Sequence, residues 1–147
     1  MATRTDDHAL LAWEKTQPAS ITGDSVWRLD CYRESLFLLR LARDDVAISA
    51  GQSTSRASGD QLLSAMASVG ANIAEGYGRG TNADRARFFT YALGSAREAV
   101  VWYQTVLPPD RAEQLADRLD RLARVKRMLL GLLARITTKN KKPFESW

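Results

Sequence analysis

The chain has 147 residues, of which 45% are hydrophobic and 26% charged, a composition that excludes an intrinsically disordered protein and suits one domain. One cysteine and one histidine exclude an intrachain disulfide and argue against a zinc site, which usually needs several such ligands. The net charge is +4, and residues 111–142 alone hold ten Lys or Arg against three Asp or Glu. This basic region could face a partner's phosphates, although a solvated helix face would have the same composition.

Residues 1–24 are rich in Ser, Thr and Asp and predict a flexible N-terminal extension, in which Trp13 and Leu10–Leu11 could still dock on the remainder. His8 lies in this extension and is poorly placed for a catalytic triad. The start of the chain is acidic and lacks the apolar core of a signal peptide. No apolar run is long enough to span a bilayer, so we expect a cytoplasmic protein with no membrane partner.

The first helix is predicted over 25–46, with Ser25 or Asp24 as its cap. Residues 36–41 are nearly all apolar, which indicates burial on several sides and contact with more than one neighbour, a second subunit included. Cys31 is expected to be a small buried residue of this helix, since a reactive thiol would need a base that the sequence does not offer.

A polar loop is predicted over 49–59 and a second helix over 60–75, whose apolar residues recur every three or four positions. Gly76 and Gly78 are expected to end this helix, because glycine adopts the left-handed conformation of a helix C-terminus at little cost.

A third helix is predicted over 82–107, with Asn82 as its cap and Pro108 as its stop. A fourth follows over 110–137, where leucines recur with the seven-residue spacing of long packed helices. Because no segment predicts a strand, we expect an all-α fold, an antiparallel up-down four-helix bundle. The bundle would cover 25–138, followed by a basic and aromatic C-terminal tail at 139–147.

The segment 68–79 places Asn72 and Glu75 among small residues at a helix end. If these two are partly buried they need partners, and Glu75 is expected to pair with one of three arginines, Arg79, Arg87 or Arg97. Gly94, inside the third helix, predicts tight packing at that point. The run from Gly76 to Gly80 is interpreted as a cap and turn, because it lacks the preceding strand and the Lys-Ser/Thr ending of a P-loop. Neither a cofactor site nor a catalytic Glu75 has supporting residues.

Two runs together resemble a known family: Asn72-Ile73-Ala74-Glu75-Gly76-Tyr77-Gly78-Arg79 and Arg87-Phe88-Phe89-Thr90-Tyr91-Ala92-Leu93-Gly94-Ser95-Ala96-Arg97-Glu98. They are similar to the bacterial four-helix-bundle family, also called the 23S rRNA intervening sequence protein family, over about Trp27 to Ile136. The accessory variability proteins of diversity-generating retroelements are its relatives. The resemblance implies an up-down bundle, often a ring-like homopentamer, with a basic surface and no known enzymatic activity. The accessory variability proteins also partner a reverse transcriptase and bind nucleic acid.

The leading hypothesis is therefore a non-catalytic homo-oligomer that binds RNA or DNA as an accessory factor, with no metal or cofactor. The predicted phosphate contacts are Arg79, Arg85, Arg87, Arg121, Arg124, Lys126, Arg127, Arg135, Lys139, Lys141 and Lys142. The alternative is a protein-interaction scaffold that does not touch nucleic acid, suggested by the apolar first helix and by Trp102, Phe144 and Trp147. No arrangement of residues supports an enzyme.

Overall fold

The structure, a computed structural model, describes residues 7–51 and 55–139. Within these ranges the chain is all-α, as predicted, and has no strand. The helices, with η for short 3₁₀ segments, are α1 (His8–Glu14), α2 (Ala19–Thr22), η2 (Ser25–Arg28), α3 (Asp30–Ser49), α4 (Ser55–Tyr77), α5 (Asn82–Val106), η3 (Pro109–Arg111) and α6 (Ala112–Lys139).

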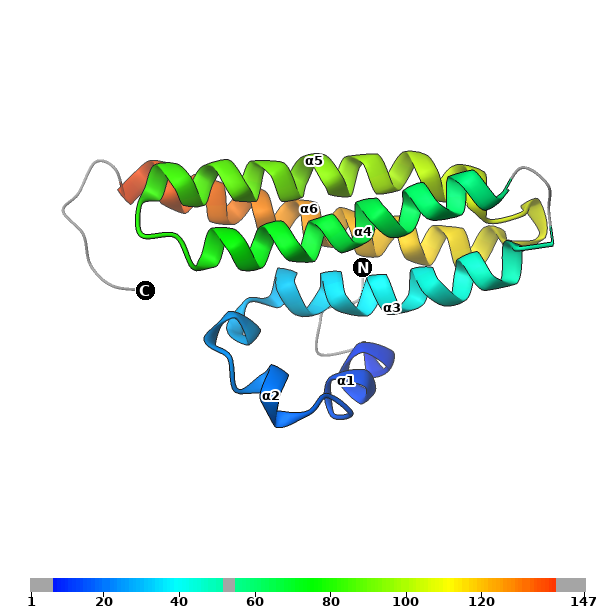
Figure 1. Cartoon of the computed structure of the whole chain (residues 1–147), viewed down its shortest axis with the longest axis horizontal. Helices are drawn as coiled ribbons and strands as arrows, with labels where there is room; N and C mark the ends of the chain where they lie inside the picture. Colours follow the sequence, from blue (N-terminus) through cyan, green and yellow to red (C-terminus); the bar gives the residue numbers. More distant parts are fainter. Residues whose placement is uncertain (1–6, 52–54, 140–147) are drawn as a thin grey trace.

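The four long helices α3 to α6 lie side by side, and the chain reverses direction from each to the next (Figure 1). Each packs against two others: α4 against α3 and α5, and α6 against α3 and α5. Their apolar faces meet in one core, in which Leu38, Met66, Tyr103 and Leu129 are fully buried. The three- and four-residue spacing of apolar residues places them on one face of each helix, so burial of these faces holds the four helices together.

The first long helix begins later than predicted, because the chain bends at Leu29. Asp24 accepts a hydrogen bond from the Val26 amide at 3.0 Å and caps η2, the 3₁₀ turn before the bend. Helix α3 then starts at Asp30 without a side-chain cap. Helix α3 ends at Ser49 and the next helix, α4, already begins at Ser55. The connection between them is therefore shorter than the predicted loop over 49–59.

The extension at the N-terminus differs most from its prediction. From residue 7 onward it forms α1 and α2 instead of a loose lead-in. Leu10 is 1% exposed, and the ring of Trp13 packs against Trp27 and Phe37 with centroids 6.0 and 5.4 Å apart. The docking that the sequence allowed for Leu10 and Trp13 thus occurs, and it fixes α1 against α3 (Figure 1).

Gly76, near the end of α4, acts through its small size. No described glycine has a positive φ, so the prediction of a left-handed cap at Gly76 or Gly78 is wrong. A Cβ on Gly76 would instead lie 2.9 Å from the Phe89 ring, so the missing side chain lets α5 approach closely. Helix α5 is capped by Thr81, not Asn82: its hydroxyl accepts from the Asp84 amide at 3.1 Å.

The predicted tight packing at Gly94 is also wrong. Gly94 is exposed, and a Cβ there would have nothing within 4 Å. The close approach of α5 uses the alanines of its inner face, Ala92, Ala96 and Ala99, which are fully buried.

Candidate nucleic-acid interface

Five arginines gather at the end of the molecule where α4 turns into α5 and where α6 ends (Figure 1). We call Arg28, Arg79, Arg85, Arg87 and Arg135 the outer arginine cluster. Arg79, Arg85 and Arg87 come from the α4–α5 turn and the first turns of α5, Arg28 from η2 and Arg135 from α6. Chain segments far apart in the sequence thus deliver arginines to one end.

The turn itself is held by polar contacts and by one aromatic ring. The Arg85 Nε donates to the Arg79 carbonyl at 2.7 Å, which ties the start of α5 back to the turn. The guanidinium carbons of Arg79 and Arg87 lie 4.7 and 5.3 Å from the centre of the Phe88 ring. Such cation–π contacts orient both cations while leaving their N–H groups available to other acceptors.

Two of these arginines also pair with carboxylates on their own helices. Arg79 pairs with Glu75, as the sequence predicted, and Arg87 pairs with Asp84 at 3.1 Å. Half of the Glu75 side-chain surface is exposed, so this carboxylate does not depend on a partner as a buried one would. Ion pairs in such exposed positions are weak and exchange readily for a phosphate.

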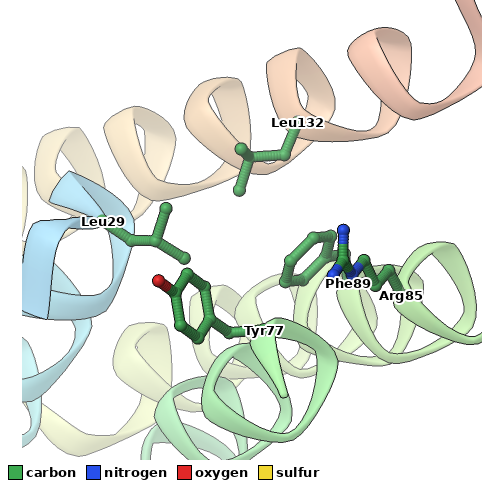
Figure 2. A pocket seen from close by; sticks show the side chains of 5 residues that line it. All are labelled: Leu29, Tyr77, Arg85, Phe89 and Leu132. Carbon is green, nitrogen blue, oxygen red and sulfur yellow. The ribbon is translucent and has the colours of Figure 1, made fainter. Parts of the chain in front are cut away.

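A small apolar pocket lies beside Arg85 of the outer arginine cluster (Figure 2). Its volume is about 210 Å³, and it is lined by Leu29, Tyr77, Arg85, Phe89 and Leu132. A neighbouring pocket shares Leu29 and Leu132 with it and adds Arg28 and Arg135 to the lining. Tyr77, Phe89 and Leu132 are not among the predicted site residues, because aromatic and leucine residues on helices are most often core residues.

The cations in the middle of α6 have a different environment. Arg118, Arg121 and Arg124, which we call the inner arginine cluster, point into the fold, where Arg121 is 7% exposed. Arg121 donates to Asp7 at 2.6 Å and to Glu34 at 3.0 Å, and Arg124 donates to the same two carboxylates at 2.9 Å each. The Arg121 guanidinium also lies 4.9 Å from the centre of the Phe37 ring.

The pKa values of the inner cluster agree with these charge pairs. Burial alone would raise the pKa of Asp7, but hydrogen bonds from Arg121 and from the Leu10 amide lower it to about 2. Burial alone would lower the pKa of Arg121, but the hydrogen bond to Asp7 and the charges of Asp117 and Glu34 raise it above its usual range. Asp7 and Arg121 therefore stay charged throughout the physiological pH range.

A second buried network surrounds Asp45 on α3. This carboxylate, which is fully buried, accepts from the Tyr103 hydroxyl at 2.9 Å, from Arg118 at 2.8 and 3.1 Å, and from Gln114. Burial, together with the nearby Asp45 charge, raises the pKa of Tyr103 well above its usual value, so the phenol remains a donor. The sequence holds no distinctive signal for this network, because Asp45 stands beside Asp44 among other charged residues of the helix and its partners lie far away in the chain.

The remaining predicted phosphate contacts lie on or beyond the later part of α6. Lys126 is partly exposed, and Arg127 is exposed and engaged in an interaction within the fold. The Lys139 side chain, together with Lys141 and Lys142, lies outside the described residues, as do Phe144 and Trp147. Trp102 is half-buried, and its indole N–H donates to Glu98 at 3.1 Å.

The other motif residues have structural positions. Asn72 is partly buried, as predicted, and its amide donates to the carbonyl and hydroxyl of Ser68 within α4 at 2.9 and 3.0 Å. Cys31 is buried on α3, and burial raises the pKa of its thiol to about 12, so it is not a nucleophile at neutral pH.

The described residues contain neither a cluster of metal ligands nor a membrane-spanning helix. Over 7–51 and 55–139, no three His, Cys, Asp or Glu residues gather as a metal site would require. In the same ranges no helix is both long and apolar enough to cross a bilayer.

Comparison with known proteins gives one result. Neither the curated proteins nor the solved structures contain a match to this chain. The family model for the 23S rRNA-intervening sequence protein matches residues 29–131, from the bend before α3 to the later turns of α6. This stretch includes all four long helices for most of their length, as well as the α4–α5 turn with its arginines. The chain therefore belongs to the 23S rRNA-intervening sequence protein family.

Proposed function

We propose that this protein is a non-catalytic nucleic-acid-binding accessory factor whose phosphate contacts are the outer arginine cluster. The observation that carries the proposal is the meeting of Arg28, Arg79, Arg85, Arg87 and Arg135 at one end of the molecule. Guanidinium groups bind phosphate through several N–H donors at once, and clustered arginines give binding that is largely independent of base sequence. The family name, which refers to ribosomal RNA, agrees with RNA as a partner.

The inner arginine cluster has no place in this interface. Its guanidiniums already donate to Asp7, Glu34 and Asp45, and breaking such pairs would leave buried carboxylates without partners. Lys126, Arg127, Lys139, Lys141 and Lys142 remain predicted as weaker contacts beside the outer cluster.

The proposal includes self-association of an antiparallel up-down four-helix bundle, with a homopentamer as the expected assembly. Exposed apolar side chains on the outer surface support it: Tyr91 and Val101 on α5 are 51% and 58% exposed. A reverse transcriptase partner is a further element, supported only by the resemblance to the accessory variability proteins.

Titration of labelled RNA and DNA at several salt concentrations tests the binding. The variant carries Arg79→Gln, Arg87→Gln and Arg135→Gln. A matched control carries Arg43→Gln, Arg56→Gln and Arg111→Gln, three exposed arginines at the opposite end of the molecule (Figure 1). We expect the variant to bind at least about ten-fold more weakly, with a salt slope lower by about 2–3, and the control to bind like the wild type. Equal losses in both variants would contradict a localised interface.

A protein-interaction scaffold is the second candidate, and the same exposed Tyr91 and Val101 favour it. Light scattering on nuclease-treated protein distinguishes the two in combination with the titration. An oligomer that binds neither RNA nor DNA would support the scaffold, and a monomer would contradict the proposed assembly.

A further inference from the structure

We infer that the pocket beside Arg85 of the outer arginine cluster receives one unpaired base of a single-stranded nucleic acid, while the arginines in and beside its lining hold the adjoining phosphates. This inference rests on the proposed function and specifies its ligand as a strand whose bases are not all paired. The pocket is the one lined by Leu29, Tyr77, Arg85, Phe89 and Leu132.

The volume of the pocket suits one ring system. At about 210 Å³ it exceeds the engineered cavity of roughly 150 Å³ that takes up benzene. It is smaller than the pockets of about 300–1,000 Å³ that enclose drug-sized ligands. A base therefore fits inside, whereas its sugar and phosphates must remain outside, where the arginines lie.

The chemistry of the lining matches a base better than a hydrocarbon. Figure 2 shows the Tyr77 and Phe89 rings and the Leu29 and Leu132 side chains around the same space, with the Arg85 guanidinium beside Phe89. Aromatic and leucine side chains cover the faces of a base, and the Tyr77 hydroxyl and Arg85 offer hydrogen bonds to its edge. The Arg85 Nε is anchored on the Arg79 carbonyl, which fixes the guanidinium in the wall.

The arginines in and beside its lining distinguish this pocket from an ordinary gap between helices. Arg28 and Arg135 line the adjoining pocket, which shares Leu29 and Leu132 with the first. Arg79 and Arg87 lie over the Phe88 ring, at the same helix start that carries Arg85 and Phe89. An apolar cavity with Arg85 in its wall and Arg28 and Arg135 in the adjoining pocket is complementary to a ring joined to phosphates.

A strand preference follows from this geometry. A base in a duplex is paired and stacked, and its extrusion costs a few kcal/mol. A single strand offers unstacked bases without that cost, so it should bind more tightly than a duplex of the same length. Stacking on protein side chains tolerates all bases, so we expect little sequence preference.

The test uses the full chain and a single-stranded oligonucleotide with one 2-aminopurine, alongside the same strand in a duplex. Leu132→Trp fills the pocket, and Tyr77→Leu removes its aromatic wall. Leu130→Trp adds the same indole two residues away on the exposed surface of α6 and serves as the matched control. Circular dichroism and thermal unfolding verify that each variant is folded.

We expect the wild type and Leu130→Trp to bind the single strand about ten-fold more tightly than the duplex, with a change in 2-aminopurine emission. Leu132→Trp and Tyr77→Leu should lose this preference and the emission change but keep the salt slope, because the arginines are intact. Salt-dependent binding with no strand preference, or pocket variants that behave like the control, would overturn the inference and leave the proposed function standing. Failure of the wild type to bind either nucleic acid would overturn both.

Discussion

The inner and outer arginine clusters contain the same side chain in opposite situations. In the inner cluster, Arg121 and Arg124 meet the carboxylates of Asp7, which caps α1, and of Glu34 on α3, more than eighty residues away in the sequence. In the outer cluster, Arg79 and Arg87 pair with carboxylates within four residues on the surface of their own helix ends. Burial turns the first set into part of the fold, whereas exposure leaves the second set free to exchange partners. The count of basic residues along α6 therefore overstates its positive surface.

The largest expected effect comes from breaking the inner cluster at Glu34. Glu34→Ala removes a carboxylate that is 3% exposed and accepts from both Arg121 and Arg124. Because it leaves buried charge uncompensated, we expect a loss of about 3–5 kcal/mol in the free energy of unfolding, measured in urea. Asp44→Ala, at an exposed carboxylate paired with Arg40, should change stability by less than about 0.5 kcal/mol. A similar small change for Glu34→Ala would contradict the closed network.

The pH dependence of stability should single out Asp7. The folded pKa of this carboxyl is lowered to about 2 from 3.8, so its stabilising contribution is complete above the unfolded pKa and is lost as pH falls towards the folded one. Asp7→Asn should cost about 2 kcal/mol at pH 7. The gap between wild type and variant should close between pH 4 and about pH 2. A gap that stays constant with pH would mean that the ion pair to Arg121 is not the cause.

The packing beneath the outer cluster can be disturbed at Gly76. A Cβ there would lie 2.9 Å from the Phe89 ring and 3.1 Å from the Phe88 Cβ, so Gly76→Ala forces both residues to shift. Overpacking of about 2 kcal/mol, offset by about 1 kcal/mol of helix propensity, gives a net loss of about 1 kcal/mol. Gly94→Ala, in open space on α5, should instead stabilise the protein by about 0.5–1 kcal/mol. Thermal unfolding of the pair checks both signs.

The smallest expected effect on stability belongs to the outer arginines themselves. Arg79→Gln, Arg87→Gln and Arg135→Gln should each change the free energy of unfolding by less than about 0.5 kcal/mol, because these side chains are exposed or nearly so. Their loss should appear in nucleic-acid affinity and not in urea unfolding. A marked destabilisation by any one of them would contradict the expectation that the outer arginines, unlike the inner ones, contribute little to the free energy of unfolding.

The positions of the long helices could be predicted from local signals. The helix predicted over 82–107 is observed at Asn82–Val106, because the apolar spacing and Pro108 are properties of the segment itself. The α1 and α2 helices could not be predicted this way. They are short, and their helical structure depends on contacts such as that between Trp13 and Phe37, which exist only in the folded chain.

The site could be predicted only in part, and for a related reason. Arg79, Arg85 and Arg87 lie close together in the sequence, so their gathering at one turn was visible in it. Arg28 and Arg135 join them because α3 and α6 pack together. Tertiary packing also pairs Arg121 and Arg124 with Asp7 and Glu34, which keeps these two arginines out of the exposed cluster. Which charges remain exposed is a property of tertiary structure, and a single sequence gives no direct measure of it.

The Asp7 carboxylate makes two kinds of contact, and together they determine which parts of the protein unfold in one step. One oxygen accepts from the Leu10 amide and caps α1, while the same group binds Arg121 and Arg124 on α6. A seven-residue helix is too short to persist alone in water, so α1 exists only while it is docked. Its amide hydrogens should then exchange with solvent in the same cooperative opening that exposes the middle of α6. Residues that precede the matched family region thus share one unit of folding with its last helix.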